Sequence, residues 1–361
     1  MMSADRSRLL ALVDALKGRR VAVAGDLIAD EFIYGQIARV SREAPVLILN
    51  YDSTEIVPGG AGNAAANVAA LGGAVRAVGL AGRDDTARRL LETLKRRRVD
   101  VGDVARPGGY RTPTKTRILA GGIHSAKQQV VRIDRASSAS ADADARDAFN
   151  TRVLAAIRGC DALLVSDYGS GLVTPALVAE ARRVFRLKSE AAGRRTKSRR
   201  VSNSSRGVRL RAEGLVLVDS RYQLLHYHGM TACTPNESEV EQALGIRIGD
   251  NARILERAGR ELLRRTRAAA VLITRGSRGI ALFEPDTRTE HIPIFGSDQI
   301  ADVTGAGDTV IATMTLALAA GATFPEAARL ANVAGGLVVM KRGTATVSAS
   351  ELRQAIAGGA E

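Results

Sequence analysis

The sequence is poor in cysteine and has no long apolar run. Its two cysteines, Cys160 and Cys233, form no metal-ligand spacing, and a reducing compartment would leave both as free thiols. No apolar run approaches the roughly 20 residues that a membrane-spanning helix needs, and residues 1–17 lack the apolar core of a signal peptide. We therefore expect a cytoplasmic protein that makes no use of a membrane.

The sequence also lacks the lysine loop of P-loop nucleotide hydrolases. Residues 193–198 come near the pattern, but they have no second glycine and lie in a strongly basic tract. His226 and His228 have no third metal ligand nearby, so we interpret them as loop residues. Neither a P-loop enzyme nor a histidine-bound metal centre is expected.

Acidic residues are scarce in one part of the chain. The formal net charge is +14, and residues 182–211 supply +11 of it, with twelve Lys or Arg and one acid. This Ser/Gly/Arg-rich tract has no apolar periodicity, whereas a nucleic-acid-binding face would be spread over the folded body. We interpret residues 187–211 as a mobile insertion and do not expect nucleic acid as a partner. A tether to nucleic acid or acidic lipid is the alternative.

What the sequence does contain favours an α/β protein. Of its 361 residues 45% are hydrophobic and 25% charged, which is typical of a soluble domain with a sizeable core. From residue 161 onward, short apolar runs alternate with helical segments, as in a parallel sheet with helices on both faces. We expect a single domain over residues 1–361, with strands near 162–167, 214–219 and 270–274 and helices near 174–184 and 252–264.

Residues 32–57 and 111–134 depart from this alternation. They contain strand-like segments that predict a small sheet standing off the body as a lid. An open strand edge would pair with a second subunit, so we expect a homodimer through the lid. The lid carries polar side chains that could face a phosphate or simply face solvent: Lys115, Arg117, Gln129 and Arg132.

The most informative stretch is Asp302-Val-Thr-Gly-Ala-Gly-Asp308-Thr309, which opens an alanine-rich apolar run. Gly305 and Gly307, with Ala306 between them, leave amides free where a helix is predicted to begin, and such amides favour an anion. Asp308 would repel a bound phosphate unless it accepts a proton from the attacking hydroxyl. We hypothesise phosphoryl transfer with Asp308 as base and these amides as the anion cradle. A glycine-rich turn capped by Asp308 is the alternative.

Polar residues also follow the predicted strands. Asp26 ends the strand near 20–25 and Asp30 follows it, while Asp167 and Asp219 end later strands. Ligands of open α/β sheets bind at this carboxyl edge. Residues 60–65 fit the dinucleotide pattern G-x-G-x-x-A, but the first buried strand lies more than thirty residues earlier, so a sugar-binding loop explains them equally well.

Taken together, these motifs resemble the ribokinase-like (PfkB) family of sugar kinases across nearly the whole chain. Residues 59–63 look like the first signature of that family, and residues 302–309 look like its second, D-x-x-G-A-G-D. Asn236-x-x-Glu239 is similar to its N-x-x-E motif, and residues 274–279 resemble its nucleotide loop. Four motifs in the right order are far more specific than any one of them.

The resemblance implies a ribokinase-like α/β fold with a β-sheet lid and ATP-dependent phosphorylation of a sugar hydroxyl with Mg²⁺. It implies that Asp308, Gly305, Ala306 and Gly307 are catalytic. The residues expected to bind the sugar are Asp26, Asp30, Gly59, Gly60, Asn63, Lys115, Arg117, Gln129, Arg132 and Asp167. Those expected at the nucleotide are Asn236, Glu239, Thr274, Gly276, Gly279 and Asn332, with Mg²⁺ held through water by Glu239, and Asp302 and Thr304 near a candidate K⁺ site.

Within the family, the strongest resemblance is to kinases that phosphorylate D-glycero-D-manno-heptose 7-phosphate at C1 for ADP-heptose synthesis. The residues that carry it are 25–26, 37–46, 58–61, 115–117, 128–134, 166–168 and 302–310. A phosphorylated acceptor would also account for the lid cations. The His-x-Gly-His motif of the adenylyltransferase fused to bifunctional relatives is not in this sequence.

Two departures from that pattern concern the substrate. Ser170 stands where those kinases carry lysine, and Asp219-Ser220-Arg221 replaces D-P-K. The first change loses a cation, and the second keeps one. The alternatives are therefore a kinase of another sugar or sugar phosphate and, from a different class, a non-catalytic sugar-binding or nucleotide-binding regulatory protein.

Overall fold

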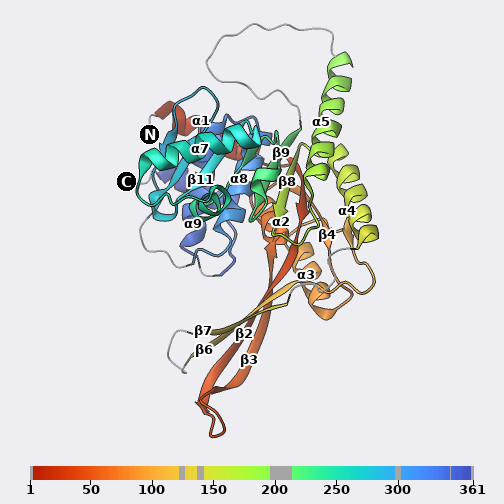
Figure 1. Ribbon diagram of the computed structural model, residues 1–361, viewed down its shortest axis with the longest axis vertical. Coiled ribbons are helices and arrows are strands. Elements are labelled where there is room, and N and C mark those ends of the chain that lie inside the picture. Colours follow the sequence, from red (N-terminus) through yellow and green to blue (C-terminus); the bar gives the residue numbers. More distant parts are fainter. Residues whose placement is uncertain are drawn as a thin grey trace.

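The computed structural model describes residues 3–121, 127–135, 142–195, 214–296, 302–341 and 343–358. A sheet with helices on both faces forms the body, and a second, narrower sheet extends from it as a long arm (Figure 1). Both chain ends lie on the same side of the body, where Arg353 forms an ion pair with Asp14 at 2.8 Å. This arrangement confirms the α/β fold with a lid that the sequence predicts.

The main sheet has nine strands in the described residues, in the order β13-β12-β11-β10-β9-β8-β1-β4-β5. All neighbours pair in parallel except β12 and β13, which are antiparallel at one edge. Its members are β1 (Arg20–Gly25), β4 (Ala74–Leu80), β5 (Val104–Ala105), β8 (Ala162–Asp167), β9 (Leu215–Ser220), β10 (Ala232–Cys233), β11 (Ala270–Thr274), β12 (Ile280–Phe283) and β13 (Glu290–Ile292).

Apolar side chains cover both faces of this sheet, which explains why its strands are continuous apolar runs rather than alternating ones. Along β1, Val21 and Val23 belong to one buried cluster, and Ala22 and Ala24 belong to the other. On the first face lie α1 (Ser3–Ala15), α2 (Ala61–Ala70), α3 (Asp85–Arg96), α8 (Ala306–Ala319), α9 (Phe324–Val339) and α10 (Ala349–Gly358). On the second lie α4 (Ala143–Ala156), α5 (Pro175–Arg195), α6 (Glu237–Leu244) and α7 (Ala252–Thr266).

Two predicted boundaries are wrong. Helix α5 runs to Arg195 instead of ending near residue 184, so the first part of the predicted insertion is helical, and residues 196–211 lie outside the described residues. Residues 60–65 do not form the expected sugar-binding loop, because Gly60 ends a lid strand and helix α2 begins at Ala61. The long-range pairing of Gly60 with Leu27 sets this boundary, and local sequence does not reveal it.

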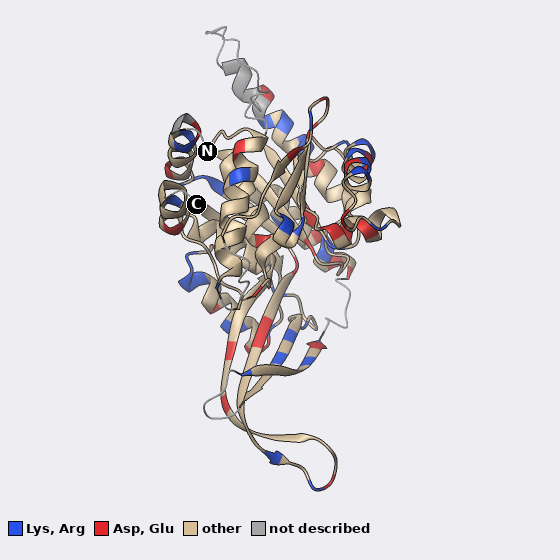
Figure 2. Ribbon diagram, turned by 90° about the vertical axis from the view of Figure 1, so that its left-hand side faces the viewer, with Lys and Arg blue, Asp and Glu red and all other residues tan. Residues whose placement is uncertain are grey.

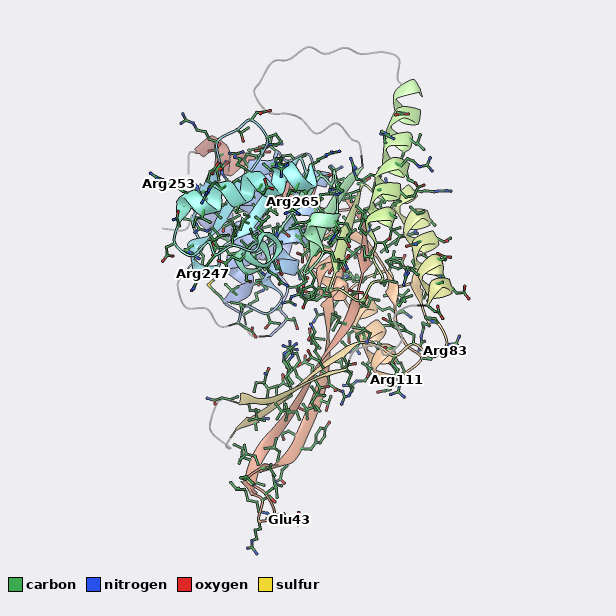
Figure 3. The ribbon with its side chains drawn as sticks, viewed as in Figure 1. Glu43, Arg83, Arg111, Arg247, Arg253 and Arg265 are labelled. Atoms are coloured by element: carbon green, nitrogen blue, oxygen red, sulfur yellow. The ribbon has the colours of Figure 1, made fainter. Side chains whose placement is uncertain are left out.

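The lid is a four-stranded sheet, as the sequence predicts. Its order is β3-β2-β6-β7, with β2 antiparallel to β3 and parallel to β6. The strands are β2 (Leu27–Val40), β3 (Leu47–Gly60), β6 (Thr114–Gly121) and β7 (Gln128–Arg135). Glu43 lies at the far end of the arm, and Arg83 and Arg111 lie near its base (Figure 3).

Charged residues of both signs are scattered over the body and the lid strands, as Figure 2 shows. Arg253 and Arg265 on α7, and Arg247 before it, lie on the body, whereas the arm extends below it (Figure 3). Cys160 and Cys233 are both buried free thiols. Among the described residues, no helix has the length and apolarity that crossing a bilayer demands.

Candidate active site

A cavity of about 860 Å³ lies where the lid joins the carboxyl edge of the main sheet. The start of α8, the loops after β8 and β9, and all four lid strands contribute to its lining. The predicted residues that line it are Asp30, Gly59, Gly60, Lys115, Arg117, Arg132, Asp167, Asn236, Glu239, Thr274, Gly276, Gly279, Thr304, Gly305, Ala306, Gly307, Asp308 and Asn332. Asp26, Asn63, Gln129 and Asp302 are not part of the lining.

Asp308 lies in the first turn of α8, and its side chain is only 4% exposed. Its Oδ2 accepts a hydrogen bond from Asn63 Nδ2 at 2.7 Å, and its Oδ1 accepts one from the Tyr168 hydroxyl at 3.4 Å. Burial raises the pKa of Asp308 to about 7, and the bonds from Asn63 and Tyr168 oppose that rise. A carboxylate with a pKa near neutrality, next to a cavity, suits a general base.

Gly305 caps α8 with a φ of 80°, a left-handed conformation that favours glycine. A Cβ there would come within 2.5 Å of Asn63 Nδ2, so a side chain would displace the group that orients Asp308. The Ala306 amide donates to the Val303 carbonyl at 3.3 Å, a long bond that a phosphate oxygen could replace. The helix start therefore has the open backbone that an anion cradle requires.

Asn63 contacts Asp308 and does not line the cavity. Its position on α2 is fixed by Asn67, whose Nδ2 donates to Asn63 O at 3.0 Å. Thr309 Oγ1 in turn donates to Asn67 Oδ1 at 3.0 Å. The sequence prediction had Asn63 on the sugar, whereas here a buried network from Thr309 through Asn67 holds it against Asp308.

Two of the three predicted lid cations are already paired with carboxylates. Arg117 Nη1 lies 2.5 Å from Asp30 Oδ1, and both side chains are largely buried. Arg132 forms two hydrogen bonds with Asp134, at 2.7 and 2.6 Å. Lys115 forms no ion pair with a described residue and lies over the Tyr168 ring, 5.1 Å from its centroid. Lys115 is thus the lid cation with the most capacity for an added anion.

Gln129 has a different position from these cations. It lies on β7, whose residues are all exposed, and its side chain does not line the cavity. Of the four predicted lid residues, Lys115, Arg117 and Arg132 line the cavity and Gln129 does not.

Tyr168 and Arg221 also line the cavity, and sequence reasoning did not name them as site residues. The Arg221 guanidinium carbon lies 5.4 Å from the centroid of the Tyr168 ring. The available signals were the Ser166-Asp167-Tyr168 run and the cation that Arg221 retains in place of a lysine. Neither signal predicts the contact, because Tyr168 and Arg221 follow different strands, β8 and β9, whose pairing brings them together.

Asp26 and Asp167 organise the loop after β8. Asp26 accepts hydrogen bonds from the Tyr168 amide at 2.7 Å and from the Ser170 hydroxyl. Asp167 accepts from the Ser220 hydroxyl at 2.7 Å and from the Tyr227 hydroxyl at 2.8 Å. Both carboxylates are satisfied by the protein itself, and of the two only Asp167 borders the cavity.

The predicted nucleotide residues also line the cavity, and none of them belongs to the lid. Asn236 and Glu239 form a capping box at the start of α6, each side chain bonding the backbone amide of the other. Gly279 has a φ of 75°, and a Cβ there would lie 2.1 Å from the Ile292 carbonyl oxygen. Asn332 Nδ2 donates to the Pro293 carbonyl at 2.8 Å. The N-x-x-E residues therefore shape a helix start as well as facing the cavity.

The cavity has oxygen donors of the kind that Mg²⁺ prefers. Asp219 and Glu239 both line it, and burial raises the pKa of each carboxyl. No cluster of three His, Cys, Asp or Glu side chains is present in the described parts of the chain. Because Mg²⁺ keeps several waters and is often held by one or two carboxylates with substrate phosphates, this pair fits it.

The residues expected at a monovalent cation have a compatible arrangement. Asp302 accepts hydrogen bonds from the Thr304 amide at 2.9 Å and from the Gly343 amide at 3.1 Å. Thr344 Oγ1, nearby in the cavity lining, is buried without a hydrogen-bond partner among the described residues. This unused oxygen fits a cation such as K⁺.

A family model described as "pfkB family carbohydrate kinase" matches residues 21–183 and 211–351. The chain is 35% identical over 353 residues to the bifunctional protein HldE of Trichlorobacter lovleyi, covering 98% of this chain and 66% of that protein. It is 37% identical to the bifunctional protein HldE of Geobacter metallireducens, covering 96% of this chain and 65% of that protein. The chain therefore spans slightly less than two thirds of these relatives.

Solved structures agree on the fold. The Arabidopsis thaliana ribokinase complexed with ribose and ATP superposes with a TM-score of 0.69 at 18% identity, covering 94% of this chain and 99% of that one. The Escherichia coli phosphofructokinase-2 in complex with potassium gives the same TM-score, identity and coverage. The fold is thus ribokinase-like, with a large mostly parallel sheet and a four-stranded lid. The chain belongs to the PfkB family of carbohydrate kinases, phosphotransferases with an alcohol group as acceptor.

Proposed function

We propose that the protein transfers the γ-phosphate of ATP to the C1 hydroxyl of D-glycero-D-manno-heptose 7-phosphate. The observation that carries this proposal is a buried base, Asp308, in a cavity that has cations on the lid side and the predicted nucleotide loop on the other. The similarity to bifunctional proteins named HldE supports the heptose acceptor, in line with the sequence resemblance to kinases fused to an adenylyltransferase.

The proposed reaction needs one proton acceptor. The acceptor hydroxyl loses its proton to Asp308 while its oxygen bonds the γ-phosphorus, and the bond from that phosphorus to the bridging oxygen of ADP breaks. The first-turn amides of α8, Gly305 to Gly307, donate to the oxygens of the transferring group. Asn63 keeps the carboxylate turned toward the cavity through its 2.7 Å bond. Asp308 then releases its proton to solvent.

The acceptor's own phosphate has candidate partners on the lid. Lys115, Arg117 and Arg132 all line the cavity, and β2 and β6 bring Asp30 and Lys115 into register. Gly59 is close to Asp30, because a Cβ there would lie 2.3 Å from Asp30 Oδ2. Only a glycine at this position lets the backbone of β3 approach the carboxylate so closely.

Bound Mg²⁺ would neutralise charge on the nucleotide phosphates, and Asp219 and Glu239 are the residues that would hold it. Asp302, Thr304 and Thr344 would hold a K⁺ ion. Thr274, Gly276, Gly279 and Asn332 would border the nucleotide.

The proposal is tested by a coupled ADP-release assay with ATP, Mg²⁺ and a panel of phosphorylated and unphosphorylated heptoses and hexoses. We expect the highest kcat/KM with heptose 7-phosphate. A higher value with another sugar phosphate would identify a different PfkB kinase, an outcome that Ser170 in place of lysine makes worth testing. No turnover with any sugar would favour a regulatory protein instead.

We also propose that two copies of the chain pair through their lids. Apolar side chains are exposed on the arm: Val40 is 59% exposed and Val46 55%, and Val131 on β7 is 46% exposed. A second lid would cover them, as exposed apolar strands generally require.

A further inference from the structure

Tyr168 contacts three functional groups at once. Its hydroxyl donates to Asp308 Oδ1 at 3.4 Å, while Lys115 Nζ and the Arg221 guanidinium carbon lie 5.1 and 5.4 Å from the centroid of its ring. All four residues line the same cavity. The side chain is thus the physical connection between the base on α8 and the cations of the lid and of the loop after β9.

The backbone of this tyrosine is fixed from behind. The Tyr168 amide donates to Asp26 Oδ2 at 2.7 Å, and the Ser170 hydroxyl donates to the other oxygen of Asp26. Asp26 is only 5% exposed, so this anchor is shielded from solvent. The serine that replaces the lysine of related kinases therefore supports the tyrosine without adding a cation to the site.

Lys115 and Arg221 lie over the Tyr168 ring, and neither forms an ion pair with a described residue. The other two lid cations that line the cavity each have a carboxylate partner, Asp30 for Arg117 and Asp134 for Arg132. An aromatic face attracts a cation without neutralising it, so Lys115 and Arg221 keep their full charge for an anion. Burial and the nearby Arg221 and Arg132 lower the pKa of Lys115, an effect that a bound anion would reverse.

We infer that Tyr168 is a positioning residue with two separable parts: its hydroxyl stabilises the ionised form of Asp308, and its ring holds Lys115 and Arg221 against the phosphate that the acceptor already carries. This inference rests on the proposed function. It adds Arg221 to the residues that select a phosphorylated sugar, and it assigns the tyrosine a role in both base strength and substrate choice.

Other charged groups also act on Asp308. Asp30 on β2 raises its pKa, and Arg221 after β9 lowers it. Asp219 at the end of β9 is also coupled to Asp308 electrostatically. These groups stay in place when only the Tyr168 hydroxyl is removed, so a shift in the pH profile of that variant reports the hydroxyl alone.

The experiment compares Tyr168→Phe and Tyr168→Leu with the wild type, using heptose 7-phosphate and the same heptose without phosphate. In the phenylalanine variant the base loses a hydrogen bond that favours its charged form, so the acid limb of kcat should move up by about half to one pH unit. Its KM for heptose 7-phosphate should stay within twofold. In the leucine variant that KM should rise about three- to tenfold, with little change for the unphosphorylated heptose.

Tyr34→Phe is the matched control. Its hydroxyl donates to Glu55 at the same 3.4 Å, but Tyr34 lies on the lid outside the cavity lining. The control should leave the pH profile and both KM values unchanged. An active wild type whose Tyr168 variants show neither the pH shift nor the phosphate-selective rise in KM would overturn this inference alone. A wild type that phosphorylates no sugar would overturn the proposed function and this inference with it.

Discussion

At the scale of the residue, Asp308 combines an ionisable group with near-complete burial. The side chain is 4% exposed, and burial is the largest cause of its raised pKa, about 7. The folded protein therefore bears a free-energy cost whenever Asp308 ionises. Active sites commonly contain such groups, because the same burial that destabilises the carboxylate makes it a stronger base.

This cost predicts that Asp308→Asn stabilises the protein at alkaline pH. Below about pH 4 Asp308 is protonated in the folded and unfolded chain alike, so the variant and the wild type should have similar free energies of unfolding. Between about pH 4 and 7 only the unfolded chain ionises, and wild-type stability falls as pH rises. At pH 8 the variant should be more stable by roughly 2 to 4 kcal/mol, measured by urea unfolding.

The comparison needs both pH values, since a substitution can change stability for unrelated reasons. The amide that Asp308→Asn introduces keeps a carbonyl oxygen, which can still accept the hydrogen bond from Asn63. An equal difference at pH 4 and pH 8 would contradict the buried-charge explanation.

At this scale, sequence reasoning identified Asp308 as the candidate base but not the residues that contact it. Asp308 and its glycines form a local motif that predicts a helix start and an anion site, and the structure has Gly305 as the cap of α8. Asn63 contacts Asp308 across 245 positions of the chain, so no spacing rule reveals that contact. Tyr168 was missed for the same reason.

At the scale of the element, Glu237 ties the predicted nucleotide loop after β11 to α6. Glu237, in the first turn of α6, forms an ion pair with Arg275 Nε at 2.7 Å and a second one with Arg278. The Arg275 and Glu237 side chains are 13% and 15% exposed, so this pair is screened less than a surface pair. The helix that carries the N-x-x-E motif thereby holds the loop that follows the next strand.

We predict that Glu237→Gln loosens this loop. The KM for ATP should rise about three- to tenfold, because the substitution leaves the largely buried Arg275 without a counter-charge and Arg278 with Asp250 alone. The KM for the sugar should change little. Steady-state kinetics with each substrate varied in turn measure both values.

Glu261→Gln is a suitable control for that experiment. Glu261 forms an ion pair with Arg264 at 2.6 Å on the exposed face of α7, and surface pairs contribute little. It should leave both KM values unchanged. If Glu237→Gln affects sugar and ATP equally, the loop is not the element that Glu237 controls.

Several elements could be predicted from local sequence because local rules determine them. The buried strands of the main sheet are present as predicted. Thr323 and Glu326 form a capping box at the start of α9, a pattern that the local sequence carries. The predicted end of α5 was wrong because alanine and arginine are good helix formers and continue the helix. The start of α2 differs because the pairing of β3 with β2, and not the glycines, decides where α2 begins.

At the scale of the whole molecule, the arm is the feature that a single chain does not explain. The β7 strand is exposed along its whole length, and apolar residues are exposed from the middle of the arm toward its end. Exposed strands with apolar side chains are usually covered in native proteins, and the lid of a partner subunit would cover these ones.

We predict a homodimer in solution, measured by size-exclusion chromatography with light scattering. The double variant Leu47→Glu and Val131→Glu should shift the protein toward a monomer, because it buries charge in the proposed contact. Ile246→Glu, which alters an exposed apolar residue of the body, should not. A monomeric wild type at micromolar concentration would contradict pairing through the lid.

The site as a whole exists only in the folded chain. The candidate base comes from α8, the lid cations come from β6 and β7, and the predicted nucleotide loop follows β11; the sheet order and the lid bring them to one cavity. The sequence predicts each part through its motif. It does not predict which cations are already neutralised, since Asp30 and Asp134 pair with Arg117 and Arg132 only through lid contacts.

The central claim is that Asp308 removes the proton from a hydroxyl of a phosphorylated sugar. It is tested most directly by following heptose 7-phosphate, ATP and Mg²⁺ by phosphorus NMR, with the wild type and Asp308→Asn compared at pH 8. We predict a new phosphate at C1 with the wild type and a kcat lower by about 10²-fold or more in the variant. Near-full activity of Asp308→Asn, or a new phosphate at another position, would contradict the account.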